Sequence, residues 1–281
     1  MNRNIAILCN RLAGSGRSVQ LGEKISFELS KHSLAYTIFV NDWPQAFLEF
    51  TDIFIAGGDG TLNYFINKYP EIKLPLVIFN GGTGNDFHWM LYSDKSFDEQ
   101  MQIALFEKPK AVDIGKCNDR YFINGIGIGF EAAVAKALIG RKKLPGKASF
   151  YISVLNNILV YKSKNYSLKI SDKTFSGKYL LIDIYNGKRS GGGFYIAPKA
   201  EPDDGLFEFI SVEALTSLQR LRYLPVIEKG KHLRLRFINY IKTDKIEIES
   251  DSLIQFHLDG EYREAEKIEI KILPAQLNFR F

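Results

Sequence analysis

Short apolar segments near the start of the chain each run directly into a glycine-rich or polar turn, and this repeat constrains the fold more than any other feature. The predicted strands are residues 5–9, 35–40, 53–56 and 74–79, and the predicted helices are residues 18–30 and 61–68. Short apolar strands that alternate with helices predict a parallel sheet with helices on its faces. Ligands of such sheets bind beyond the carboxyl ends of the strands.

The pattern changes after about residue 113, where strands become more frequent than helices. Helices are expected only around residues 131–139, 150–161 and 215–224. Strict alternation over residues 245–249 and 267–272 indicates strands with one face on a core and one in water. We therefore predict an α/β protein with a Rossmann-like three-layer domain at residues 1–115. A β-rich, antiparallel, sandwich-like domain follows at residues 116–281, and the active site is expected in the cleft between them.

Composition excludes several classes of protein. The only cysteines, Cys9 and Cys117, have neither a disulfide framework nor zinc-site spacing, which favours a reducing compartment. The N-terminus lacks the long apolar stretch of a secretory signal, and the apolar run at residues 148–161 is too short to span a bilayer. The sequence thus predicts a cytoplasmic protein.

The net charge of +5 is unevenly distributed. Residues 1–115 carry a net charge of −3 and the remainder carries +8. Two basic runs in the second part, residues 141–147 and 229–236, mix charge with apolar side chains, as a peripheral contact with an anionic membrane surface requires. A solvated basic face explains either run equally well. Nucleic acid is not an expected partner because no binding motif accompanies the charge, and a homodimer stays open.

The stretch 55–63 combines a buried strand, a glycine turn and a helix start. Glycines let a backbone approach a ligand closely, and successive N–H groups at a helix start attract anions. Asp59 would repel a phosphate unless a divalent cation lay between them, as Mg²⁺ does in phosphoryl transfer. An ordinary strand-to-helix turn is the local alternative.

Two further turns favour the interpretation of residues 55–63 as a phosphate-binding turn. Residues 77–87 repeat the order of strand, glycines, hydroxyl residue and aspartate, and residues 10–16 form a polar turn after the first strand, where Arg11 would add positive charge. In a parallel sheet all three turns open at the same edge. The chain has no Walker A sequence, and the spacing of residues 125–129 differs from the dinucleotide fingerprint, so we interpret those glycines as close backbone packing.

These motifs resemble the catalytic domain of the diacylglycerol kinase and sphingosine kinase superfamily, especially its bacterial soluble lipid kinases. The resemblance rests on six segments in the family's order, which cover nearly the whole chain: residues 57–63, 80–87, 112–115, 122–129, 197–206 and 258–261. The first of them is shared more distantly with NAD kinases and phosphofructokinases. The last two favour the lipid branch.

The resemblance implies which residues surround ATP. They are Asn10, Arg11, Leu12, Ala13, Gly14, Gly58, Asp59, Gly60, Thr61, Leu62, Asn63, Tyr64, Thr83 and Asp86, with Asn41 as a loose candidate for an expected threonine. Tyr64 is a departure, because the family usually has glutamate there. The chain also ends at a strand, where many relatives have a further helix.

The resemblance further implies a Mg²⁺ site and a base in the second domain. Asp204 would bind the metal through its side chain, and Glu201 and Leu206 through their carbonyls. Glu261 or Asp259 would accept the proton of the substrate hydroxyl. Because Asp-Gly is the commonest two-residue hairpin signal, the turns at 204–205 and 259–260 have a purely structural alternative.

The predicted function is therefore that of a kinase that uses ATP and Mg²⁺ to phosphorylate a lipid hydroxyl, with diacylglycerol giving phosphatidic acid as the first choice. A sphingoid base, phosphatidylglycerol or an undecaprenol-like alcohol would also suit such a site. Two rivals stay open: a kinase of a soluble substrate such as NAD, and a nucleotide-binding regulator that has lost catalysis.

Overall fold

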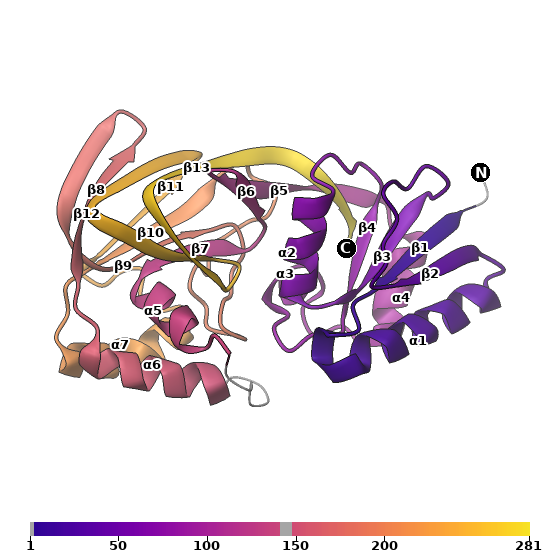
Figure 1. The fold of residues 1–281 in the computed structure, drawn as a ribbon, viewed down its shortest axis with the longest axis horizontal. Helices are drawn as coiled ribbons and strands as arrows, with labels where there is room; N and C mark the ends of the chain where they lie inside the picture. The colour runs from indigo at the N-terminus through magenta and orange to yellow at the C-terminus, as the bar shows by residue number, and fades with distance from the viewer. Residues whose placement is uncertain (1–2, 141–147) are drawn as a thin grey trace. The chain divides into compact units, whose positions relative to one another are not determined.

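The computed structural model describes residues 3–140 and 148–281, and the chain divides into two compact units (Figure 1). Unit 1 comprises Met1–Val112 and Ala275–Phe281, and unit 2 comprises Asp113–Pro274. The chain passes between the units within two strands, β5 (Pro109–Cys117) and β13 (Glu261–Arg280). The observed division differs from the predicted one in this last strand, whose end belongs to unit 1.

Unit 1 alternates strands and helices. Its elements are β1 (Asn4–Cys9), the short 3₁₀ turn η1 (Ala13–Gly16), α1 (Arg17–Lys31), β2 (Ala35–Val40), β3 (Asp52–Gly57), α2 (Asp59–Lys68), β4 (Leu76–Asn80), α3 (Asp86–Tyr92) and α4 (Phe97–Phe106). The strands lie in the order β4-β3-β1-β2, and each neighbouring pair is parallel. β1 and β3 are central and almost wholly buried, which explains their continuous apolar sequences.

The C-terminal strand joins this sheet beside β4. Phe279 pairs in parallel with Leu76 and packs its ring against Phe87. Arg280 donates from Nε to the buried carboxylate of Asp52 at 2.9 Å, and Arg3 donates to the same carboxylate. A buried carboxylate needs such partners because an unpaired one is costly. These contacts fasten the end of the chain to unit 1.

Unit 2 is rich in strands. Its elements after β5 are β6 (Arg120–Phe122), β7 (Gly125–Gly129), α5 (Phe130–Ala137), α6 (Ala148–Val160), β8 (Lys164–Ile170), β9 (Lys173–Tyr185), β10 (Phe207–Glu213), α7 (Ser217–Glu228), β11 (Ile238–Thr243), β12 (Lys245–Leu258) and β13. Within the described residues, β10 pairs antiparallel with β9 and β11, β12 with β7, β8 and β13, β9 with β7 and β8, and β5 with β6. β9 and β12 each pair with β7 at one end and with β8 at the other.

The alternation in β12 and β13 fixes their register. Ile246 lies opposite Ile270 and Ile248 opposite Ile268, and all four are fully buried in one core. Charged residues occupy the positions between them and face outward. A shift by one residue would move every isoleucine into water, so the pairing is strongly specified. The antiparallel arrangement predicted for these two segments is confirmed.

The three helices α5, α6 and α7 gather along one side of the antiparallel strands (Figure 1). Thr216 and Gln219 form a reciprocal capping box at the start of α7. No helix in the described part of the chain is long and apolar enough to cross a membrane. The predicted basic run at residues 141–147 lies outside the described residues.

The chain is thus a mixed α/β protein with a β-rich second part, as the sequence predicts. The expected helices at 131–139, 150–161 and 215–224 correspond to α5, α6 and α7 with shifted ends. Such shifts are ordinary, because helix ends depend on capping contacts that periodicity does not contain.

Candidate functional site

The three polar turns of unit 1 meet at one edge of the parallel sheet. They follow β1, β3 and β4, whose carboxyl ends are neighbours. Asn10 donates from Nδ2 to Oγ1 of Thr61 at 3.3 Å, which links the first turn to the second. The N–H of Asp59 donates to the carbonyl of Gly84 at 3.1 Å, which links the second turn to the third. The juxtaposition expected from the sequence therefore exists.

Glycine is required where the second and third turns touch. A Cβ on Gly58 would lie 2.5 Å from the carbonyl oxygen of Gly84 and 2.9 Å from the Cα of Gly82. Both contacts are with backbone atoms, which cannot move aside as a flexible side chain could. Gly60 is different, because a Cβ there would meet nothing within 4 Å. The backbone at Gly60 therefore borders open space, as a ligand-binding turn requires.

Asp59 holds the third turn in place. Its carboxylate accepts the N–H of Asp86 at 2.8 Å and the N–H of Phe87 at 3.2 Å. These are amides of the first turn of α3, which have no partner within the helix. Asp59 therefore has a structural task that the sequence did not indicate, beside any role of its charge toward a ligand.

The residues predicted to bind the nucleotide surround this edge of the sheet and differ in solvent exposure. Asn41 adopts a positive φ of 65° and accepts the N–H of Arg11 at 2.9 Å, so this loose candidate does join the first turn. Tyr64 is 56% exposed, with its ring centroid 5.4 Å from that of Trp43. The exposed members are Arg11, Leu12, Asn41, Gly60, Tyr64 and Thr83; the buried ones are Gly58, Thr61, Leu62 and Asp86; Asn10, Ala13, Gly14, Asp59 and Asn63 are intermediate.

In unit 2, Asp259 and Gly260 form the two-residue turn between β12 and β13. Both have positive φ, 48° and 89°, and Leu258 pairs with Glu261 across the turn. The Asp259 carboxylate accepts three backbone N–H groups at 2.9 Å each, from Ile123, Asn124 and Gly125. Asp259 therefore anchors the turn to the start of β7, which supports its structural reading.

Glu261 has a different environment. It is exposed at the first position of β13. Within the described residues, no group donates a hydrogen bond to its carboxylate. Of the two predicted bases, Glu261 is thus the one whose carboxylate is free to accept a proton from a substrate.

A buried network supports this turn, and the sequence interpretation missed it. His257 Nδ1 accepts the N–H of Gly260 at 3.2 Å, and His257 Nε2 lies 3.1 Å from Oε2 of Glu131. The same Glu131 oxygen accepts the hydroxyl of Tyr185 at 2.9 Å. A Cβ on Gly127 would lie within 2.4 Å of both Glu131 and His257, so only glycine leaves room for the network. The sequence pattern did not signal this network, because His257 occupies a polar position in the alternation of β12, between Phe256 and Leu258.

The predicted metal residues lie in one turn, but their chemistry does not fit a metal ion. Oδ2 of Asp204 lies 2.6 Å from Nζ of Lys242, and Oδ1 accepts the N–H of Leu206 at 3.0 Å. Lys242 also lies 3.4 Å from Oε1 of the buried Glu208. The hydrogen bond that Lys242 donates to Asp204 and the charge of Glu208 raise the pKa of Lys242. The ammonium group already supplies the positive charge that Mg²⁺ would bring, and Glu201 is exposed.

A substitution of Lys242 tests this conclusion. Lys242→Met leaves the Asp204 and Glu208 carboxylates without their cation, so we expect the free energy of unfolding to fall by about 1–3 kcal/mol. Mg²⁺ should restore part of the loss in this variant, whereas the unfolding of the wild type should not respond to Mg²⁺ or to a chelator. Lys245→Met removes an exposed lysine from Glu247 and is the matched control. Destabilisation of the wild type by a chelator would show that a metal does bind at Asp204.

Comparisons with known proteins identify two family domains. Residues 4–117 match the model described as "Diacylglycerol kinase catalytic domain". Residues 124–280 match the model described as "YegS C-terminal NAD kinase beta sandwich-like domain". Together they cover both units and all of the turns described above.

Relatives and solved structures agree with these matches. A Staphylococcus aureus (strain Newman) protein named "Putative lipid kinase" is 30% identical over 79% of this chain and 74% of its own length. A Shewanella frigidimarina protein named "Probable lipid kinase YegS-like" is 28% identical over 81% of this chain and 75% of its own. A crystal structure titled "a putative diacylglycerol kinase from Bacillus anthracis str. Sterne" has a TM-score of 0.79 at 23% identity, covering 100% of this chain and 97% of that one. A yeast NADH kinase in complex with NADH has a TM-score of 0.53 at 10% identity, covering 99% and 83%.

Proposed function

Because the chain belongs to the family of lipid kinases that join a diacylglycerol kinase catalytic domain to a YegS-type C-terminal domain, we propose that it transfers the γ-phosphoryl group of ATP to a lipid hydroxyl. The first-choice acceptor is diacylglycerol, which would give phosphatidic acid. The observation that carries the proposal is the meeting of three turns around the open backbone of Gly60. Unit 1 would serve as a Rossmann-like nucleotide domain.

In this proposal the turns of unit 1 hold the nucleotide. Backbone N–H groups beside glycines bind phosphate oxygens well because no side chain intervenes. Asn10, Gly60 and Thr61 come from two turns joined by a hydrogen bond, and Arg11 adds a positive charge at the exposed rim. Mg²⁺ that arrives bound to ATP would neutralise part of the phosphate charge.

Glu261 is the proposed base. It would take the proton of the lipid hydroxyl as that oxygen forms a bond to the γ-phosphorus. The bond between the γ-phosphorus and its bridging oxygen would break, and ADP would leave with the electron pair. Positioning and charge neutralisation supply most of the rate in such reactions, so no covalent enzyme intermediate is needed.

Two glycine substitutions separate binding from folding. Gly60→Ala introduces a Cβ into open space in the first turn of α2, so we expect it to raise the free energy of unfolding by up to about 1 kcal/mol. If phosphates approach this backbone, the same methyl group should weaken ATP binding at least 10-fold. Gly58→Ala is the contrasting variant, and we expect it to unfold at lower temperature because its Cβ meets backbone. Calorimetric titration and thermal melting measure both effects, and unchanged ATP affinity in Gly60→Ala would contradict the placement.

The lipid acceptor is favoured by an apolar cavity in unit 2, lined from β9, β10 and the three helices. Incubation with labelled ATP and a total lipid extract, followed by mass identification of the labelled product, tests the acceptor. Label in a lipid phosphate supports the proposal. Absence of any labelled lipid, with ATP bound, would instead favour a regulator that has lost catalysis.

A kinase of NAD is the second candidate. The fold shared with the yeast NADH kinase and the description of the C-terminal family model favour it. A soluble dinucleotide has no use for an apolar cavity, however. Activity that rises with vesicles or micelles would point to the lipid, and activity indifferent to them would point to NAD.

We also propose a peripheral contact with an anionic membrane. The helix α6 exposes Leu155, Leu159 and Val160, with Leu159 70% exposed. The predicted basic run at residues 229–236 has four exposed cations: Lys229, Lys231, Arg234 and Arg236. Each cation near an anionic surface contributes about 1 kcal/mol and is screened by salt. The fraction of protein that sediments with anionic vesicles should therefore fall as the salt concentration rises. Equal binding to neutral vesicles would contradict the proposed membrane contact.

A further inference from the structure

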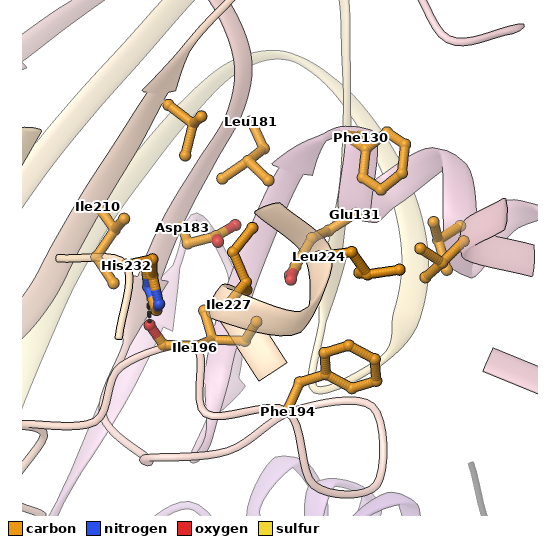
Figure 2. A pocket seen from close by; sticks show the side chains of 13 residues that line it. Phe130, Glu131, Leu181, Asp183, Phe194, Ile196, Ile210, Leu224, Ile227 and His232 are labelled. Atoms are coloured by element: carbon orange, nitrogen blue, oxygen red, sulfur yellow. Dashed lines mark hydrogen bonds between the residues drawn. The ribbon is translucent and has the colours of Figure 1, made fainter. Parts of the chain in front are cut away.

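The apolar cavity of unit 2 contains polar atoms that nothing in the fold explains. The space that the centre of a water molecule can occupy in it is about 60 Å³, within about 530 Å³ of space between atoms that includes open solvent. Among the described residues, its walls are aliphatic and aromatic, from residues such as Phe130, Leu181 and Ile227, apart from three polar side chains (Figure 2). These three are Glu131, Asp183 and His232.

Asp183 and His232 each have one buried polar atom without a hydrogen-bond partner among the described residues, unlike Glu131. Oε2 of Glu131 accepts the hydroxyl of Tyr185 and contacts His257, as described above. Asp183 and His232 are each only 2% exposed. Within the described residues, Oδ1 of Asp183 and Nδ1 of His232 have no hydrogen-bond partner. Buried polar atoms are normally satisfied, so two of them at one apolar cavity require a reason.

The available hydrogen-bonding roles of the two atoms are complementary. His232 Nε2 lies 2.9 Å from the carbonyl oxygen of Ile196, which can only accept, so Nε2 carries the hydrogen and Nδ1 is an acceptor (Figure 2). Burial lowers the pKa of His232, which keeps the ring neutral. Burial, and then the charge of Glu131, raise the pKa of Asp183 well above its ordinary value, which favours the protonated acid. Such an acid is a donor.

We propose that this cavity binds an aliphatic chain that carries a hydroxyl group, with the hydroxyl accepting from Asp183 and donating to His232. A hydroxyl is the smallest group that both accepts and donates, and the apolar walls match the chain. The site thereby defines the class of ligand as a long-chain alcohol or a hydroxyl-bearing lipid chain. Its identification with the lipid acceptor rests on the proposed function, whereas binding at the cavity does not.

The test compares two isomers in calorimetric titrations of the full-length protein without ATP. 1-Octanol and 1-methoxyheptane have the same atoms, but the ether cannot donate a hydrogen bond. We expect the wild type to bind the alcohol about 10-fold more tightly than the ether. Equal affinity for both isomers would overturn the proposal and would leave the polar atoms to buried water. Failure of octanol to bind up to its solubility limit would overturn it as well.

Variants of Asp183 sharpen the test. Asp183→Leu should abolish the preference for the alcohol and also raise the melting temperature, because it removes a buried polar group without breaking a hydrogen bond. Asp183→Asn keeps a donor and should retain most of the preference. If Asp183→Leu does not fold, the isomer comparison in wild type and Asp183→Asn still decides the matter. A wild-type preference that persists in Asp183→Leu would contradict the role of Asp183.

Because these titrations contain no ATP, they are independent of catalysis. Alcohol-selective binding together with no phosphorylation of any lipid would leave the cavity inference standing and refute the proposed function. Lipid phosphorylation with no preference between the isomers would support the proposed function and refute the cavity inference.

Discussion

Replacing Glu261 by Gln should lower turnover at saturating ATP and lipid by roughly 10²–10⁴-fold, the usual contribution of a general base. Gln has the same size and cannot accept the proton of the hydroxyl. The melting temperature should not change, because Glu261 is exposed and receives no hydrogen bond from any described residue. ATP affinity should change little as well, since the proposed nucleotide turns belong to unit 1.

Two variants give this experiment its controls. Glu266→Gln alters another exposed glutamate of β13 and should be silent. Asp259→Asn should lower the melting temperature, because an amide group cannot accept all three N–H bonds that the carboxylate receives. Turnover lost in Asp259→Asn would thus come with lost stability. Near-normal turnover in Glu261→Gln would remove this residue from the chemistry.

Replacing Asp59 by Asn should reduce turnover by about 10²-fold or more, because the variant lacks the negative charge that would attract the Mg²⁺ of the bound nucleotide. The sequence alone predicts that even Asp59→Ala leaves the fold intact. The structure changes this expectation, because the carboxylate caps the first turn of α3 through Asp86 and Phe87. Loss of such a cap costs about 1 kcal/mol. Asn keeps an accepting oxygen and is therefore the more informative variant.

A comparison of the wild type with Asp59→Ala and Asp59→Asn separates the role of Asp59 in turnover from its role in stability. Asp59→Ala should lose both turnover and stability, and Asp59→Asn should lose turnover with a smaller change in melting temperature. Asp98→Asn, in the exposed first turn of α4, is the control. If Asp59→Asn turns over like the wild type, the charge of Asp59 serves only the fold.

The sequence predicted most of unit 1 because its information is local. Apolar strands, helical spacing and glycine turns each occupy a few neighbouring residues, and the rule for parallel sheets then places three turns at one edge. The contact of Asn10 with Thr61 and the loose candidate Asn41 both agree with that placement.

What the sequence could not predict depends on distant contacts. The carboxylate of Asp59 accepts the N–H groups of Asp86 and Phe87, which lie much later in the sequence. The carboxylate of Asp259 accepts those of residues 123–125, which lie much earlier in the sequence. Lys242 forms an ion pair with Asp204 only because β11, which carries Lys242, lies beside the turn that precedes β10. No periodicity or spacing contains these pairings, since register between distant strands decides them.

The cavity was also beyond sequence reasoning. Its lining comes from α5, α6, α7, β9 and β10 and from the connecting segments that contain Phe194, Ile196 and His232, and its apolar residues are indistinguishable in the sequence from ordinary core residues. Only Asp183, an acidic residue within the apolar strand β9, carried a signal. A charged residue at a buried strand position is unusual enough to mark a site worth attention.

The most direct test of the central claim is a competition between acceptors in one reaction. The reaction contains purified protein, γ-labelled ATP, vesicles with diacylglycerol, and free NAD. The label in phosphatidic acid in the lipid fraction and the label in the dinucleotide in the aqueous fraction are then measured separately. We expect label in phosphatidic acid in the lipid fraction, and we expect that label to be lost in Glu261→Gln. Label in the aqueous dinucleotide, with none in lipid, would contradict it.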